Sequence, residues 1–450
     1  MMSLAEAAAA TEGRVHGPDV RLAGVATDSR GIGNGALFVA IRGERFDGHD
    51  FLGAARSRGA AAAMVDARFN GAAPLPVLVV DDTRRALGRL GRHWRARFAP
   101  VVIGIAGANG KTTTKEMLAA ILRAHAGEAA VLATKGNLNT DIGVPLTLLD
   151  LRAAHRYCAV ELGMNHPGEI EWLAAIAQPT IGLVTNAQRE HMEFMGSVEA
   201  SARENAHLLR ALPAAGIAVL NADDPCDPIF REAAGTRRIV DFAVERKAAV
   251  TGGYALKPLA SEIRLRTPAG EARVMLAIPG LHNVRNAVAA AACAHAAGIP
   301  AAAISAGLTA FRPYAGRLQV KRGLGGATVL DDSYNANPDS MRAAIDVLAA
   351  CTAPTVLVLG DMGEVGAHGP QFHREVGAYA RERGIGALYA LGEASREAVA
   401  AFGQGARHFS SPEHLRAALP AAATVLVKGS RFMRMERVVA ALTGEGEGGH

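Results

Sequence analysis

Short apolar runs alternate with amphipathic stretches along most of the chain. Apolar runs of this length, followed by polar or turn-forming residues, predict buried strands. The predicted strands are Ala36–Ile41, Val77–Val80, Val101–Ile105, Ile181–Val184, Ile217–Leu220, Ala327–Leu330, Thr355–Leu359, Ala387–Leu391 and Thr424–Val427. Thr83–Arg97 and Pro338–Ala350 have helical periodicity, the first with Leu87 and Leu90 on its apolar face. Strand–helix alternation favours parallel sheets covered by helices, and therefore an α/β fold.

The length of 450 residues exceeds what a single hydrophobic core usually serves. A new series of predicted strands and helices begins after Pro100, and another begins at Gly316. We therefore predict three domains, at residues 1–98, 99–314 and 315–450. Gly444–His450 is expected to be a terminal tail.

Composition narrows the class of protein. The net charge of +5 is dispersed, and no segment interleaves basic with aromatic residues, so nucleic acid is not an expected partner. The four cysteines form no CxxC motif, and Cys158 and Cys293 lie in apolar or alanine-rich runs typical of buried thiols. We find neither a signal peptide nor an apolar run of the ~20 residues that a membrane span needs. The expectation is a soluble, cytoplasmic protein.

The strongest chemical signal is the segment at residues 104–113, Gly-Ile-Ala-Gly-Ala-Asn-Gly-Lys-Thr-Thr. A predicted strand leads into it, and a helix with an apolar face follows. Glycines admit an anion to the backbone, Lys111 neutralises its charge, and Thr112 can reach Mg²⁺. Gly104 stands one residue earlier than the strict P-loop pattern requires. The arrangement predicts nucleotide binding, against the alternative of a simple glycine-rich turn.

Two further residues follow predicted strands of the same segment. Glu161 comes directly after an apolar run, where α/β proteins bind ligands, and its pattern fits a Mg²⁺ ligand about as well as a helix cap or a solvated acid. His191 follows Ile181–Val184 in a polar loop. Taken alone, such a histidine is more typical of a polar surface than of a ligand site.

Polar loops also follow the strands of the third segment. They lie at residues 331–338, 359–364 and 427–431. Asn283 and Asn286, at one helix start, could bind a ligand or could only cap the helix. Three polar loops at strand carboxyl ends of one sheet favour a shared ligand edge.

In combination, these motifs resemble the Mur ligase family of peptidoglycan synthesis. The resemblance is carried by residues 107–113, Glu161, His191, His282-Asn283 with Asn286, Gly316-Arg317 and Asp332. The loops at 134–145, 332–338, 359–364 and 427–431 are similar to those of the member that adds D-alanyl-D-alanine. Residues 27–30 and 43–50 resemble a UDP-substrate domain.

The resemblance implies a UDP-substrate domain, a central P-loop ATPase-type domain with a parallel sheet, and a carboxy-terminal Rossmann-like domain. The last domain would close over the nucleotide and bind the incoming dipeptide. The implied substrates are ATP with Mg²⁺, UDP-N-acetylmuramoyl-tripeptide and D-alanyl-D-alanine. Through an acyl phosphate they would give the pentapeptide precursor, ADP and phosphate. The implied protein is a monomer.

The resemblance also implies residue roles. Lys111, Glu161 and His191 would form the catalytic set, with Lys111 on the β- and γ-phosphates, and Thr112, Glu161 and His191 would hold Mg²⁺. The implied ATP-binding residues are Gly107, Ala108, Asn109, Gly110, Lys111, Thr112, Thr113, Asn283, Arg317, Asp332 and Asn337. The implied substrate-binding residues are Ser29, Arg30, Asp47, His49, Asn137 and Asn139.

Two positions depart from the family pattern. Counting back from residues 216–221, Asn205 stands where the family usually carries a lysine modified to a carbamate that supports a second Mg²⁺; a count shifted by two would place Arg203 there instead. Thr140 stands where an asparagine is expected. Glu204, next to Asn205, would point about 100° away on a helix and cannot simply substitute. We therefore expect an enzyme without a carbamate. The third residue of the tripeptide, diaminopimelate or lysine, does not follow from the sequence.

Other functions compete with this one. Within the enzyme class, the chain could be a folylpolyglutamate-type ligase or the ligase that adds the third amino acid, although residues 331–338 and 427–431 argue against both. In another class, it could be a nucleotide-binding regulator without turnover. The presence of Lys111, Glu161 and His191 argues against a regulator.

Overall fold

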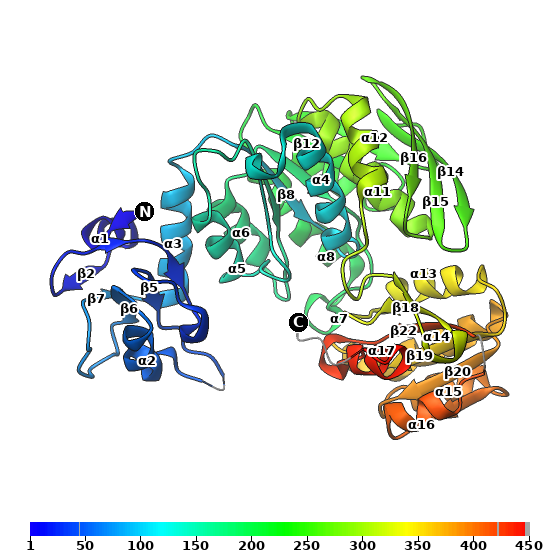
Figure 1. Cartoon of the computed structure of the whole chain (residues 1–450). Helices are drawn as coiled ribbons and strands as arrows, with labels where there is room; N and C mark the ends of the chain where they lie inside the picture. The colour runs from blue at the N-terminus through cyan, green and yellow to red at the C-terminus, as the bar shows by residue number, and fades with distance from the viewer. Residues whose placement is uncertain (45, 421–422, 446–450) are drawn as a thin grey trace.

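The computed structural model describes residues 1–44, 46–420 and 423–445. Within these ranges the strands form three main sheets, of five, nine and six strands, and a small two-stranded sheet. Each main sheet belongs to one section of the chain, with the sections arranged as in Figure 1. The predicted α/β class with three domains is confirmed. The boundaries at 98/99 and 314/315 stay predictions, and Arg45 and most of the predicted tail lie outside the described residues.

The N-terminal domain holds the five-stranded sheet. Its order is β2 (Arg14–His16), β7 (Val77–Val80), β6 (Ala62–Asp66), β5 (Leu37–Val39), β4 (Val25–Ala26). β2 is antiparallel to β7, and the other neighbours are parallel. The small sheet pairs β1 (Met2–Ser3) with β3 (Arg21–Leu22). The helices are α1 (Leu4–Thr11), α2 (Leu52–Ser57) and α3 (Thr83–Arg95).

Helix α3 joins the N-terminal domain to the central one (Figure 1). Asp82 begins it by accepting a hydrogen bond from the backbone N–H of Arg85 at 2.9 Å. Leu87, Leu90 and Trp94 are buried in an apolar cluster that continues into the central domain. The Trp94 indole donates to the carbonyl of Leu151 at 3.1 Å. The amphipathic pattern that predicted this helix therefore also fixes the junction between two domains.

The central domain contains the nine-stranded sheet. Its order is β16 (Gly270–Leu276), β15 (Ala260–Thr267), β14 (Val250–Lys257), β13 (Arg238–Ala243), β12 (Ile217–Asn221), β11 (Ile181–Val184), β8 (Val101–Ala106), β10 (Tyr157–Glu161), β9 (Val131–Ala133). The helices are α4 (Lys111–Ala126), α5 (Gly143–Leu149), α6 (Glu169–Ala177), α7 (Met192–Met195), α8 (Val198–Asn205), α9 (His207–Arg210), α10 (Asp227–Ala234), α11 (Leu281–Ala296), α12 (Ala301–Ala310).

The strand–helix alternation predicted for this domain is wrong between β14 and β16. These three strands follow one another as antiparallel neighbours, whereas the strands from β14 to β9 are parallel. In β15, Ile263 and Leu265 are buried while Glu262 and Arg264 are exposed. An antiparallel sheet can leave one face exposed to solvent, so these strands need apolar residues only at every second position.

The C-terminal domain contains the six-stranded sheet. Its order is β17 (Gln319–Arg322), β18 (Thr328–Asp332), β22 (Thr424–Lys428), β19 (Thr355–Gly360), β20 (Ala387–Leu391), β21 (Ala406–His408). Only the β17–β18 pair is antiparallel within the described residues. The helices are α13 (Pro338–Ala349), α14 (Gly369–Glu382), α15 (Arg396–Phe402), α16 (Pro412–Ala417) and α17 (Glu436–Thr443).

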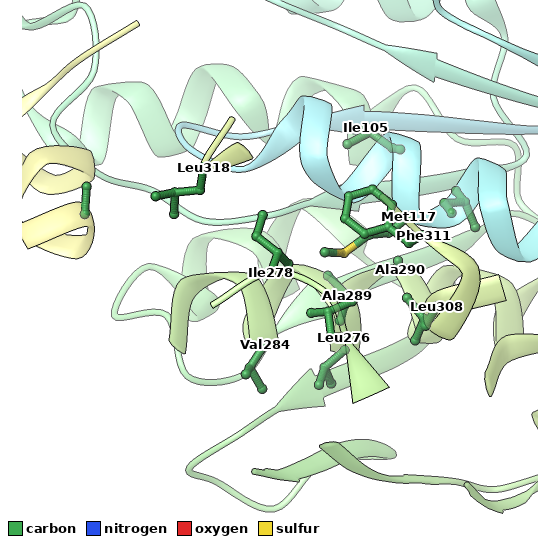
Figure 2. Close-up of a cluster of buried hydrophobic side chains, with 14 of the residues drawn as sticks. Ile105, Met117, Leu276, Ile278, Val284, Ala289, Ala290, Leu308, Phe311 and Leu318 are labelled. Atoms are coloured by element: carbon green, nitrogen blue, oxygen red, sulfur yellow. The ribbon is translucent and has the colours of Figure 1, made fainter. Parts of the chain in front are cut away.

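One buried apolar cluster spans the central and C-terminal domains. Figure 2 shows part of it, where Met117 of α4 and Phe311 pack near the alanines of α11, with Leu318 at the side of the C-terminal domain. The cluster continues to Val347 of α13. Full burial of a Met or Phe side chain stabilises a fold by about 1.5–3 kcal/mol. This packing fixes the edge of the central sheet next to the loops of the C-terminal domain.

The cysteines agree with their sequence pattern. All four, which lie within the described residues, are free thiols. Burial raises the pKa of the Cys158 thiol to about 12 and raises that of Cys293 further, so neither is a reactive thiolate at neutral pH. Among the described helices, none has the length and apolar character that crossing a membrane would require.

Candidate active site

The carboxyl ends of β8, β10 and β11 meet at one edge of the central sheet, because the three strands are parallel neighbours. A cleft of about 1170 Å³ opens there, between all three domains. Its N-terminal-domain wall includes Glu44, Asp82, Arg84 and Arg85. Its C-terminal-domain wall includes Arg317, Tyr334, Asn335, Asn337, Glu364 and Lys428. All three polar loops of the C-terminal domain therefore border one cleft, and ligand binding there stays a prediction.

Glycine is required at two positions of the loop between β8 and α4. Gly107 and Gly110 have φ of +122° and +81°, which side chains rarely tolerate. A Cβ on Gly110 would lie 2.2 Å from Asn286 Oδ1, and one on Gly107 equally close to Thr185 Oγ1. The loop leads directly into α4, whose first N–H groups have no intrahelical partner. This helix start is the surface at which the motif predicts that an anion binds.

Lys111 lies at the centre of this surface. Its Nζ donates to the carbonyls of Gly107 and Ala108, the latter at 3.1 Å, and lies 3.4 Å from Glu190 Oε2. The side chain is largely buried against the loop, with 15% exposed. Lys111 also lines the cleft at the first turn of α4, where the motif predicts a bound phosphate.

Thr112 and Glu161 form a cradle for a cation. Glu161, buried at the end of β10, accepts hydrogen bonds at Oε1 from Thr112 Oγ1 at 3.1 Å and Asn139 Nδ2 at 2.9 Å. Its buried Oε2 has no hydrogen-bond partner among the described residues. An unpartnered carboxylate oxygen beside a hydroxyl suits a hard cation such as Mg²⁺. Thr112 and Glu161 thus fit the ion that the family resemblance implied.

His191 is placed differently from the other predicted metal ligands. It begins α7 with φ of +45°, and its Nδ1 lies 2.6 Å from Glu364 Oε2 in the C-terminal domain. This contact holds the pKa of Glu364 below its usual value. Across the described residues, no three His, Cys, Asp or Glu side chains are grouped to hold a metal. A metal role for His191 stays a prediction.

The predicted nucleotide contacts of the C-terminal domain divide into two groups. Asn337, the N-cap of α13, lines the cleft and donates to Asn109 Oδ1 at 2.9 Å. Arg317 also lines it, with its guanidinium 4.2 Å from the Tyr334 ring centre and a buried Nε that no described residue satisfies. Asp332 is instead buried beside Lys428, at 2.7 Å from its Nζ. It stands behind the cleft wall.

Asn283 is likewise enclosed. Its Nδ2 donates to the carbonyl of Pro279 at 2.8 Å, and its Oδ1 accepts from Asn286 at 3.2 Å. Asn286 in turn lies against Gly110. Asn283 therefore supports, through Asn286, the loop between β8 and α4 (residues 107–110, here called the phosphate loop). Direct contact of Asn283 with nucleotide stays a prediction.

Of the predicted substrate residues, Asn139 lines the main cleft, whereas Asn137 is exposed outside it. The turn that holds Ser29 and Arg30 borders a second cavity of about 250 Å³ between the N-terminal and central domains. Arg30 forms an exposed ion pair with Asp28.

Asp47 and His49 belong to a polar network of the N-terminal domain. Asp47 Oδ1 lies 2.6 Å from His49 Nδ1, and His49 Nε2 accepts from the backbone N–H of Asp66 at 3.2 Å. Arg42 contacts both carboxylates. These contacts position the loop at residues 46–51, and substrate contact by either residue stays a prediction.

Several residues that the sequence analysis did not single out contact the predicted site residues or the C-terminal domain. Asn186 accepts from the backbone N–H of Asn109 at 2.9 Å, and Glu190 contacts Lys111. Arg189 is bound to Asp339 of α13. All three lie in the loop after β11, and their position beside His191 was the available signal.

Asn205 contacts the phosphate loop. Its Oδ1 accepts from the backbone N–H of Gly107 at 2.7 Å, and its Nδ2 donates to Glu190 Oε1 at 3.2 Å. Glu204 points elsewhere, because its two oxygens accept from the N–H groups of Gly168 and Ile170 at 2.9 Å and cap α6. The expected divergence of these neighbouring side chains is confirmed.

Three family models match successive parts of the chain. "Mur ligase family, catalytic domain" matches residues 21–95, "Mur ligase middle domain" residues 105–294, and "Mur ligase, glutamate ligase domain" residues 316–431. The UDP-N-acetylmuramoyl-tripeptide–D-alanyl-D-alanine ligase of Escherichia coli is 40% identical over 443 residues, covering 96% of each chain. The chain belongs to the Mur ligase family. This Mur ligase is therefore an ATP-dependent ligase, as the family resemblance implied.

Solved structures extend the comparison. MurF from Acinetobacter baumannii superposes with a TM-score of 0.90 at 34% identity, covering 98% of both chains. MurF from Thermotoga maritima, solved in complex with ADP, gives a TM-score of 0.80 at 25% identity and covers 94% of this chain and 97% of its own. The three-domain architecture is thus shared with these Mur ligases.

Proposed function

We propose that this Mur ligase joins the terminal carboxylate of UDP-N-acetylmuramoyl-tripeptide to the amine of D-alanyl-D-alanine, with ATP converted to ADP and phosphate. The agreement over nearly its whole length with the E. coli ligase of that name carries the proposal. The cleft between three domains, with Lys111 at its phosphate end, supports it. Monomeric action in the cytoplasm is part of the same proposal.

The chemistry follows from the weakness of a carboxylate as an electrophile. In the first step, a carboxylate oxygen of the tripeptide attacks the γ-phosphorus of ATP, and ADP leaves. In the second, the dipeptide amine attacks the acyl carbon, and phosphate leaves with that oxygen while the nitrogen loses a proton. Both steps depend mainly on positioning and on neutralising phosphate charge.

In this proposal Lys111 binds the β- and γ-phosphates at the start of α4, and Thr112 and Glu161 would hold Mg²⁺. Bound there, Mg²⁺ would neutralise phosphate charge. Arg317 offers its unpartnered Nε to the nucleotide. Asn337 closes on Asn109 and so couples the C-terminal domain to the phosphate loop.

The remaining predicted roles belong to the same proposal. His191 would help to hold Mg²⁺, and Asn283 and Asp332 support nucleotide binding. Ser29, Arg30, Asp47, His49, Asn137 and Asn139 serve the UDP-linked substrate. Asn139 has the most direct structural support, since it bonds Glu161 within the cleft.

The test supplies ATP, Mg²⁺ and a UDP-tripeptide ending in diaminopimelate or in lysine, with and without D-alanyl-D-alanine. Phosphate release and product mass are measured together. We expect release only with all substrates, and a product heavier than the tripeptide by the dipeptide less one water. Turnover of a UDP-dipeptide with a single amino acid, in place of the UDP-tripeptide with D-alanyl-D-alanine, would favour the ligase that adds the third amino acid. Binding without turnover would favour a regulator.

A further inference from the structure

Glu190 is a buried carboxylate in the wall of the phosphate end of the cleft. It is 4% exposed, lines the cleft and directly precedes His191 in the sequence. Its Oε1 accepts from Ser201 Oγ at 3.0 Å and Asn205 Nδ2 at 3.2 Å, while Oε2 lies 3.4 Å from Lys111 Nζ. Both oxygens are therefore engaged, one by neutral donors and the other by an ammonium group.

These contacts close a ring around the phosphate loop. Asn205 donates a hydrogen bond to Glu190 and accepts one from the backbone N–H of Gly107. Lys111 donates both to Glu190 and to the carbonyl of the same Gly107. The ring thus holds the two peptide groups that flank Gly107 and the Lys111 side chain at once. It connects the loop between β8 and α4 and the first residue of α4 with the loop after β11 and with α8, about 80 to 100 residues further along the chain.

The charge of Glu190 has opposite consequences for binding and for turnover. Before nucleotide arrives, the carboxylate holds the Lys111 ammonium group at the loop. Phosphates must then compete for that ammonium group, and they meet a buried negative charge beside it. The carboxylate therefore lowers nucleotide affinity while it keeps the lysine in place.

We propose that Glu190 is a positioning residue for the ligase reaction, which orients Lys111 and the phosphate loop for phosphoryl transfer at the expense of nucleotide affinity. The inference deepens the proposed function and rests on it. Glu190 acts through Lys111 and Asn205.

The test compares Glu190→Gln with Glu199→Gln, which removes an equal charge from an exposed position on α8. A Gln side chain keeps the size, but its amide turns a donor either toward Lys111 or toward Asn205, so one contact of the ring is lost. We measure the Kd of ADP by calorimetry with Mg²⁺ and with EDTA, together with kcat, KM for ATP and Tm.

For Glu190→Gln we expect ADP to bind about five- to tenfold more tightly, with the larger gain in EDTA, where no divalent ion screens the carboxylate. We expect kcat to fall at least tenfold and Tm to change little. Glu199→Gln should match the parent in every measurement. Equal kcat and equal Kd in Glu190→Gln would overturn the proposal, as would weaker ADP binding together with lower kcat.

A second variant guards against misfolding of the first. Ser201→Ala removes one donor to Glu190 Oε1 and keeps the charge, so we expect kcat to fall about threefold with an unchanged Kd for ADP. An unchanged kcat would count against the ring. Failure of the proposed function would appear in the parent enzyme as absent ligation, while ADP affinity would still test Glu190.

Discussion

Arg189 of the central domain is bound to Asp339 of the C-terminal domain through both its side chain and its backbone. Its Nη2 lies 2.6 Å and its Nε 3.1 Å from Asp339 Oδ1, and its backbone N–H donates to Oδ2 at 2.9 Å. Its Nη1 also donates to Glu375 at 2.8 Å. Two residues before Asp339, Asn337 contacts Asn109 of the phosphate loop. The pair therefore links the C-terminal domain to the central domain beside the loop between β8 and α4.

Replacing Arg189 by Ala should loosen the contact between the central and C-terminal domains. Hydrogen bonds to charged groups contribute about 1.5–3 kcal/mol each when both partners are fixed. We expect KM for ATP to rise about five- to tenfold, or about 1–1.4 kcal/mol, and kcat to fall. Small-angle scattering with ATP and UDP-tripeptide should show a larger radius of gyration than in the parent enzyme.

Two control experiments test whether the effect is specific to the Arg189–Asp339 contact. Arg238→Ala removes an exposed arginine of the same domain and should leave KM unchanged. Asp339→Ala should reproduce the loss seen in Arg189→Ala, and the double variant should add little to it. Fully additive effects would show that the two residues act independently.

Replacing Lys111 by Ala should abolish turnover without unfolding the protein, because Lys111 supplies the positive charge at the start of α4. We expect phosphate release to fall at least a thousandfold, as for other groups that neutralise transferring phosphoryl oxygens. Lys247→Ala, at an exposed loop position, is the matched control. Near-normal phosphate release with an unchanged melting curve would remove Lys111 from the mechanism.

The sequence located those parts of the site that are local in the chain. Gly107, Gly110 and Lys111 stand within five residues, and Glu161 ends a strand whose apolar run is plain. Their convergence follows from strand order alone, because parallel neighbours end at one edge.

The partners of these residues could not be predicted in the same way. Asn205 is 98 residues from Gly107, and Glu190 is 79 residues from Lys111. Such contacts depend on how α8 and the loop after β11 pack, which no local pattern specifies. Asp332 is polar and follows a strand, so the pattern predicts that it faces the ligand. A polar residue at that position can equally well be buried in an ion pair, and Asp332 is buried beside Lys428.

Asn205 cannot carry a carbamate, so activity should not depend on dissolved CO₂. We expect equal kcat in degassed and in bicarbonate-supplemented buffer, within about twofold. A second Mg²⁺ should bind more weakly than in lysine-bearing relatives, since an amide offers a hard cation one neutral oxygen in place of an anionic pair. Activity is measured against Mg²⁺ concentration in both buffers. Marked rescue by bicarbonate would mean that some lysine is carbamylated.

His282 should make stability fall in mild acid. Burial lowers its pKa to about 4, with Lys428 and Arg285 adding to the shift and Asp332 and Asp346 opposing it. The unfolded chain takes up a proton below pH ~6.5 and the folded one only near pH 4, so stability is lost as pH falls through this window. At pH 5 the loss is about 2 kcal/mol.

His282→Gln should remove this part of the pH dependence. We expect a smaller difference in Tm between pH 7 and pH 5 than in the parent enzyme, and His16→Gln, at an exposed position, should show the parent difference. Equal differences in Tm for His282→Gln and the parent would place the acid sensitivity elsewhere.

The fate of one oxygen atom tests the central claim most directly. UDP-tripeptide labelled with ¹⁸O in its terminal carboxylate is incubated with ATP, Mg²⁺ and D-alanyl-D-alanine, and the released phosphate is analysed by mass spectrometry. An acyl phosphate requires that a carboxylate oxygen leave with phosphate, so we predict one ¹⁸O in each phosphate released. Unlabelled phosphate beside a fully formed pentapeptide product would contradict activation of the carboxylate by phosphoryl transfer.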